Sequence, residues 1–76
     1  MELEGIYTLE DIIGEIISVK PWSPGMVIRN GHVRALFLNS LALEKLDFDF
    51  TVFPFLQYLD ISWNDLKEFP ESIIGL

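Results

Sequence analysis

Few side chains in this chain of 76 residues could carry out covalent or acid–base chemistry. His32 is its single histidine and follows the turn residue Gly31, a place where an exposed strand residue is expected. Cysteine is absent, so a disulfide, a thiolate nucleophile and a cysteine zinc site are excluded. Ser40 and Ser62 have no base near them in the sequence. We therefore expect no enzymatic activity.

Two pairs of acidic residues are the remaining candidates for chemistry. Asp47 with Asp49, and Asp60 with Asp65, are spaced closely enough for acid–base work or for binding a cation. Neither pair lies in a calcium-loop pattern or beside a histidine. An acidic-site hydrolase or metal-binding protein is therefore a distant alternative, and we predict no cofactor and no metal.

The charge balance argues against several classes of partner. Twelve acidic residues stand against five basic ones, which gives a net charge of −7, and the basic residues form no run. A phosphate backbone would repel such a chain, so nucleic acid is not expected as a partner. The apolar runs are far shorter than the roughly 20 residues that span a bilayer, and no signal-peptide pattern is present. We expect a cytoplasmic protein without a membrane partner.

Two elements are predicted before residue 39. Hydrophobic residues recur at the spacing of one helix face over residues 9–19, and Pro21 is expected to end that helix. Trp22 is expected to pack as a wedge between the helix and the next strand. Asn30-Gly31 is typical of a tight type I′ turn and predicts a β-hairpin over residues 26–38. The helix residues expected to cover the core are Ile12, Ile13 and Ile16.

Hydrophobic positions in the second half of the chain form two matching copies. Leu56, Leu59 and Ile61 follow Val33, Leu36 and Leu38 at one constant offset, and the match continues to the end of the chain. Strict alternation in the hairpin would place Arg34 on the same face as Leu36, whereas the repeat needs Val33 there. A bend between Val33 and Leu36 would satisfy both patterns.

This spacing resembles the leucine-rich repeat family, in its form of about 23 residues per unit with a proline late in the second copy. The resemblance implies an α/β fold: a short solenoid with a capping helix and a hairpin leading into a small, mostly parallel sheet. One domain over residues 1–76 would consist of a cap (1–32), a first repeat (33–55) and a second repeat (56–76). Strands would centre on residues 35–38 and 58–61, with Leu36 beside Leu59. Asn64 resembles the family's ladder asparagine, whose amide satisfies backbone groups where the chain turns; the first copy has Leu41 there.

The resemblance also implies a function, namely protein–protein interaction through the concave strand face. The aromatic residues at these positions are typical interface anchors, although they could instead pack against neighbouring strands or the helix. The alternative is the N-terminal cap of a longer leucine-rich-repeat protein, with a structural or oligomerisation role. The partner-binding positions would be Phe37, Asn39, Tyr58, Asp60, Ser62, Trp63 and Asp65.

Two repeats are fewer than such folds usually need, so the last strand is expected to form an open edge. Pairing of two such edges would give a homodimer through the C-terminal repeat. The residues of this self-association edge would be Leu59, Ile61, Phe69, Ile73 and Leu76.

Overall fold

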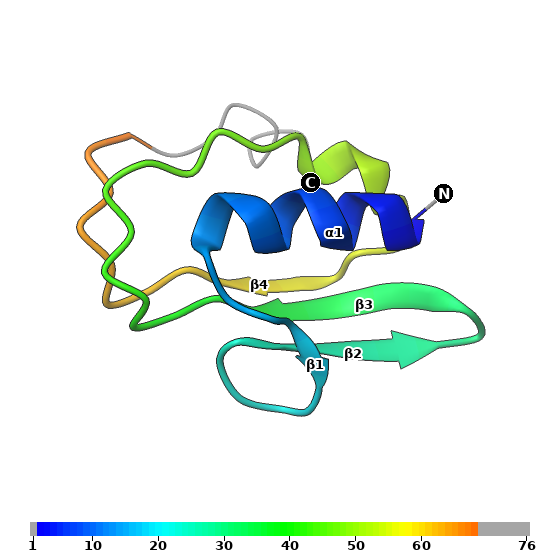
Figure 1. Cartoon of the computed structure of the whole chain (residues 1–76). Coiled ribbons are helices and arrows are strands. Elements are labelled where there is room, and N and C mark those ends of the chain that lie inside the picture. The colour runs from blue at the N-terminus through cyan, green and yellow to red at the C-terminus, as the bar shows by residue number, and fades with distance from the viewer. Residues whose placement is uncertain (1, 69–76) are drawn as a thin grey trace.

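The computed structural model describes residues 2–68 and has an α/β architecture. Within these residues one helix lies with a four-stranded mixed sheet whose order is β1-β2-β3-β4. In Figure 1 the strands lie along the bottom and the returning segment with η1 along the top, with α1 between them in this view. No helix among the described residues is long and apolar enough to cross a membrane. The elements are α1 (Glu2–Ile13), β1 (Ser18–Val19), β2 (Gly25–Arg29), β3 (His32–Phe37), the 3-10 helix η1 (Phe50–Val52) and β4 (Tyr58–Asp60).

Helix α1 begins and ends earlier than the sequence predicted. Ile6, Leu9 and Ile13 form its buried face, at the three- and four-residue spacing of a helix. The predicted range of 9–19 was wrong because the helix stops before Gly14, which has a φ of +75° that glycine adopts without steric cost. Ile12 and Ile16, expected in the core, are 37% and 72% exposed.

The chain after α1 is held by the helix itself. Gly14 N–H donates to the Glu10 carbonyl at 2.8 Å, and the Glu10 carboxylate accepts from Ile17 N–H at 2.7 Å. Ile17 therefore turns back into the core, with 4% of its surface exposed, although it lies outside the helix. Trp22 is 62% exposed, so the prediction that it packs as a wedge was wrong.

The predicted hairpin is confirmed, and its one irregularity resolves the conflict at Arg34. Asn30 and Gly31 have φ angles of 53° and 76°, as a type I′ turn requires. Strands β2 and β3 are antiparallel, and their register shifts between Val27 and Ile28, which leaves Arg34 without an opposite residue. This β-bulge lets Val33 and Leu36 both face the core, where they are 4% and 0% exposed.

Strand β4 pairs with β3 as the repeat in the sequence predicted. The two strands are parallel and Leu36 lies beside Leu59. Backbone bonds continue the pairing past the strands, from Leu38 N–H to the Asp60 carbonyl at 2.8 Å and from Ser40 N–H to the Ser62 carbonyl at 3.0 Å. Leu38 and Ile61, the next pair of equivalent residues, are therefore also in register.

Matching hydrophobic positions differ in burial between the two copies. Leu36 and Leu38 are 0% exposed, whereas Leu59 and Ile61 are only partly buried against the same core. The first copy is covered on both sides, by α1 and β2 on one and by the second copy on the other. At the second copy, the sheet of described residues ends with β4. The core cluster consists of Ile6, Leu9, Ile13, Ile17, Met26, Val33, Leu36, Leu38, Leu43, Leu46, Phe48, Phe50 and Phe53.

Candidate interaction surface

The sheet brings three predicted partner-binding residues together on the face that points away from the core. Side chains alternate along a strand, so Phe37, Tyr58 and Asp60 lie opposite to Leu36 and Leu59. The rings of Phe37 and Tyr58 are tilted by 45° with centroids 5.5 Å apart. Phe37 is half-buried and Tyr58 is 53% exposed, so this pair both packs and presents ring surface to solvent. We call this surface the outer face of the sheet.

Asp60 and Ser62 form a local turn at the end of β4. One Asp60 carboxylate oxygen accepts from Ser62 N–H at 2.9 Å and from the Ser62 hydroxyl at 2.6 Å. The carboxylate thus terminates the strand by satisfying backbone and side-chain donors two residues on. Ser62 donates to a carboxylate and not to a basic nitrogen, an arrangement that would not activate its hydroxyl as a nucleophile.

Trp63 follows this turn with an unusual backbone and an exposed ring. Its φ is +57°, a region that costs bulky residues about 1–2 kcal/mol. Ser40, the equivalent residue of the first copy, has a φ of 59°, so the two copies share this turn geometry. Trp63 is 85% exposed, and burial of the ring therefore does not compensate for the cost.

Asn64 fixes the turn that carries Trp63. Its side-chain oxygen accepts from the N–H groups of Leu41 and Leu43 at 3.0 and 3.1 Å. Its amide nitrogen donates to the carbonyls of Leu38 and Ile61, both at 2.9 Å. The amide therefore links the turns of the two copies, as predicted for an asparagine at this position.

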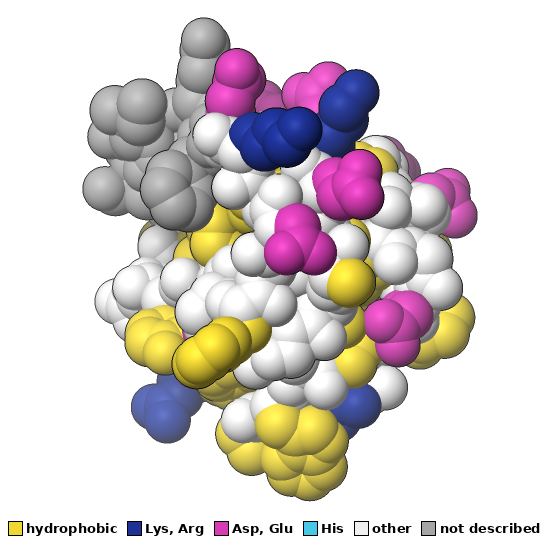
Figure 2. All heavy atoms as spheres, turned by 90° about the vertical axis from the view of Figure 1, so that its left-hand side faces the viewer, with side chains coloured by type: hydrophobic (Ala, Val, Ile, Leu, Met, Phe, Trp, Pro, Cys, Tyr) yellow, Lys and Arg dark blue, Asp and Glu magenta, His cyan; other side chains and the backbone are white. Residues whose placement is uncertain are grey.

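Asn39 and Asp65, the two remaining candidates, border the surface. Asn39 follows β3 and is half-buried; Asp65 is exposed, and its N–H donates to the Leu43 carbonyl at 2.8 Å. Figure 2 looks at this end of the molecule, where β3 and β4 run into their turns. Most of the large hydrophobic side chains lie in the lower half of that view and most of the acidic ones in the upper half. The loop between β1 and β2, with the exposed Trp22, also lies at this end (Figure 1).

The predicted self-association edge is described only in part. Leu59 and Ile61 lie at the outer strand of the described sheet and are half-buried. Phe69, Ile73 and Leu76 fall outside the described residues.

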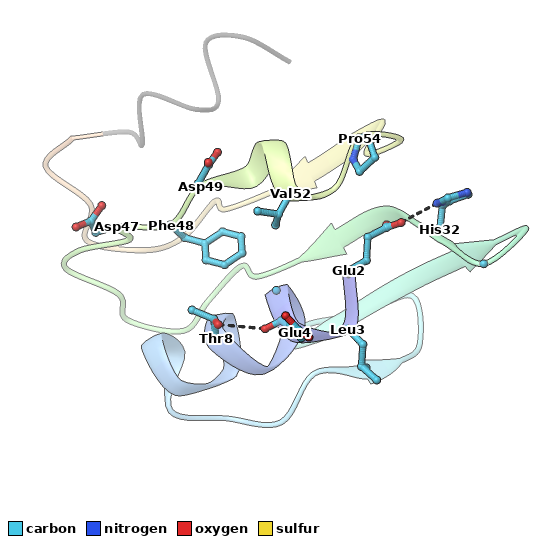
Figure 3. Close-up of a pocket in the computed structure, with 12 residues that line it drawn as sticks. Glu2, Leu3, Glu4, Thr8, His32, Asp47, Phe48, Asp49, Val52 and Pro54 are labelled. Carbon is cyan, nitrogen blue, oxygen red and sulfur yellow. Dashed lines mark hydrogen bonds and ion pairs between the residues drawn. The ribbon is translucent and has the colours of Figure 1, made fainter.

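A second surface, which the sequence did not indicate, is an open groove between α1 and the segment 47–54. Figure 3 shows Phe48 and Val52 reaching toward α1, while Asp47 and Asp49 point outward at the far rim. The Asp49 carboxylate caps η1 by accepting a hydrogen bond from Thr51 N–H at 3.0 Å. Among the described residues, no three His, Asp or Glu side chains converge into a group that could hold a metal ion.

One end of the groove holds a hydrogen-bonded contact between Glu2 and His32. The two Glu2 carboxylate oxygens contact His32 Nδ1 at 2.6 Å and Val33 N–H at 2.8 Å (Figure 3). Partial burial pushes the pKa of Glu2 upward, but the hydrogen bonds from His32 and Val33 outweigh it and leave that pKa below its ordinary value. The contact joins residues 30 positions apart, so no local pattern could have revealed it.

The exposed ring of Phe55 packs against His32 and Arg34. The Phe55 ring centroid lies 4.2 Å from that of His32 and 5.2 Å from Arg34 Cζ. His32 is therefore engaged on both sides, by a carboxylate and by a ring.

Comparison of the chain with protein-family models, with curated proteins and with solved structures found no match in any of the three.

Proposed function

We propose that this chain is a protein–protein interaction module of the leucine-rich-repeat type, which binds its partner through the outer face of the sheet and the turn after β4. The observation that carries the proposal is Trp63. A large apolar ring stands 85% exposed on a residue whose backbone angle disfavours bulky side chains. Folding gains little from tryptophan at this position, whereas tryptophan is enriched among residues that dominate binding energy.

The surroundings of Trp63 support the same conclusion. Asn64 holds the turn with five hydrogen bonds to backbone groups, so the ring is presented from a fixed backbone. The half-buried Phe37 and the exposed Tyr58 provide a neighbouring aromatic surface on the sheet. A fixed support lowers the entropy lost on binding.

Three features favour the repeat type. Leu36 pairs with Leu59, its equivalent in the second copy; Ser40 and Trp63 share a left-handed backbone; and Asn64 links both turns. The outer face of the sheet would correspond to the family's concave face. The net charge of −7 suggests a partner with basic groups around an apolar centre.

The proposal can be tested by comparing proteins captured by the native chain with those captured by Trp63→Ser and Ile16→Ser chains. Ile16 is 72% exposed on the segment after α1 and serves as the matched control. Partners that use the proposed site should bind the native and Ile16→Ser chains but lose at least about 30-fold in affinity for Trp63→Ser, the effect of an anchor worth about 2 kcal/mol.

Fluorescence then checks that the contact is direct. A Trp22→Phe chain retains Trp63 as its single tryptophan, and burial by a purified partner should shift its emission to the blue. An unchanged emission at saturation, or equal losses with Trp63→Ser and Ile16→Ser, would contradict the proposal.

A further inference from the structure

We propose that two copies of this chain pair antiparallel through the edge of β4, with Leu59 facing its own symmetry mate. The edge shares Tyr58 and Asp60 with the outer face of the sheet, so the two proposals are tested separately, by Leu59→Cys at the edge and by Trp63→Ser at the turn after β4. The starting observation is the difference in burial between equivalent residues: Leu36 is 0% exposed, while Leu59 is only partly buried.

The backbone of β4 is oriented for such pairing. Asp60 directs its carbonyl to β3, where it accepts from Leu38 N–H. Successive residues of a strand point their backbone groups to opposite sides, so the N–H and carbonyl of Leu59 face away from β3, where the described part of the sheet ends. Leu59 can therefore exchange both hydrogen bonds with an identical residue across a two-fold axis.

The side chains of the edge are compatible with their own symmetry copies. In this register the two Leu59 side chains meet on the core side, where Ile61 and Leu66 of each copy are also partly buried against the core. On the outer face Tyr58 lies opposite Asp60 of the second copy, so no two acidic residues of β4 face each other. A two-fold arrangement covers both open ends in one closed assembly.

Other arrangements with a second copy fit less well. Head-to-tail pairing would use β1, which has only two residues, Ser18 and Val19, both exposed. It would also leave one β4 edge open at the end of every assembly. The two-fold pairing is therefore the arrangement that the described edges favour.

Single cysteines test the register, because the native chain contains none. Leu59→Cys should form a disulfide-linked dimer under mild oxidation, since hydrogen-bonded antiparallel pairs have Cα atoms about 5.5 Å apart. Ser18→Cys, at the opposite edge, should not. Cross-linking of Ser18→Cys to Leu59→Cys in a mixture, or equal self-linking of both variants, would overturn the proposal.

Charge substitutions at Tyr58 test the proposed dimer without changing a core residue. Tyr58 is 53% exposed, and Tyr58→Lys would place two opposite-charge pairs across the axis. Sedimentation equilibrium should show association strengthened about tenfold in Tyr58→Lys and weakened in Tyr58→Glu. Added salt should strengthen the native dimer, because each copy carries a net charge of −7. A monomer at millimolar concentration, or no difference between the two variants, would refute the dimer.

Discussion

A single side-chain amide, that of Asn64, holds the two turns of the chain together. It accepts from Leu41 and Leu43 N–H groups and donates to the Leu38 and Ile61 carbonyls. A leucine-sized apolar group could make none of these bonds, and each backbone group left unpaired in a buried site costs about 1–3 kcal/mol. The same amide sets the backbone of Trp63, so stability and the proposed binding surface depend on one residue.

Replacing Asn64 by aspartate separates its accepting role from its donating role. The carboxylate of Asn64→Asp can still accept from Leu41 and Leu43, but it cannot donate to Leu38 and Ile61. We expect a loss of about 2 kcal/mol or more in the free energy of unfolding at neutral pH. Protonation restores one O–H donor, so the loss should shrink at acid pH. Urea unfolding at both pH values measures this, with Asn39→Asp as the control; a loss independent of pH would contradict it.

Glu2 makes a second pH-dependent contribution to the stability of the fold. Because the hydrogen bonds from His32 and Val33 keep its folded-state pKa below the ordinary value, the carboxylate stabilises the fold above its unfolded-state pKa. That contribution is lost as the pH falls through the lower, folded-state pKa. Glu2→Gln should therefore be less stable than the native chain at neutral pH and approach it in acid. Thermal unfolding over this range is the measurement; a difference that stays constant would count against the contact.

Patterns in the sequence predicted some of these residues and not others. Asn64 and the Leu36–Leu59 pair were predictable because a constant repeat period places both copies in one register. Glu2 with His32 was not, because its partners are 30 residues apart and belong to different elements. The exposure of Trp22 and Trp63, 62% and 85%, was not predictable either, because the burial of a single aromatic residue is a property of the assembled fold.

At the scale of elements, the boundaries of α1 show how local geometry overrides periodicity. Isoleucines 12, 13, 16 and 17 continue a helical pattern, yet Gly14 in the left-handed region ends the helix before two of them. The start was missed because Glu2, Leu3 and Glu4 show no apolar period; their acids suit the positive end of the helix dipole instead. The hairpin was predictable to within a residue because Asn-Gly specifies both its turn and its register.

Neighbouring isoleucines in α1 provide a direct test of how the helix packs. Ile13 is 9% exposed and belongs to the core, whereas Ile12 is 37% exposed. Ile13→Asp would bury a charge, at a cost of several kcal/mol that is comparable to the whole stability of a small domain. We expect Ile13→Asp to unfold and Ile12→Asp to change the stability by no more than about 1 kcal/mol. Circular dichroism melting curves compare them, and similar curves for the two variants would show that the packing described is wrong.

Gly5 sets how closely α1 approaches the returning chain. A Cβ atom at this position would lie 2.9 Å from Val52 Cγ2 and 3.2 Å from the Phe53 ring. Alanine is the better helix former by about 1 kcal/mol, so Gly5→Ala would be stabilising in an isolated helix. Here we expect the variant to be destabilised or unchanged, because Phe53 is fully buried and cannot move away. A rise in melting temperature would mean that α1 packs less tightly than described.

At the scale of the molecule, burial falls from β3 to β4, the last strand of the described sheet. β3 lies between two partners and contains the fully buried Leu36, whereas β4 has one partner among residues 2–68 and a half-buried Leu59. Such a difference is expected where each unit is stabilised by its neighbours and β4 is the last strand of the described sheet.

Native-state hydrogen exchange resolves this difference strand by strand. The Leu36 and Leu38 amides should exchange slowly, because both residues are fully buried and Leu38 N–H is bonded to the Asp60 carbonyl of β4. The Leu59 amide, which faces away from β3 at the end of the described sheet, should exchange far faster in dilute solution. Pairing of two β4 edges would slow it as the protein concentration rises, while leaving the Leu36 rate unchanged. Equal protection of Leu36 and Leu59 in dilute solution would mean that the edge is already covered within one chain. If the Leu59 amide exchanges fast at every protein concentration, the difference in burial between β3 and β4 stands. The proposal that a second copy pairs with the β4 edge is then wrong.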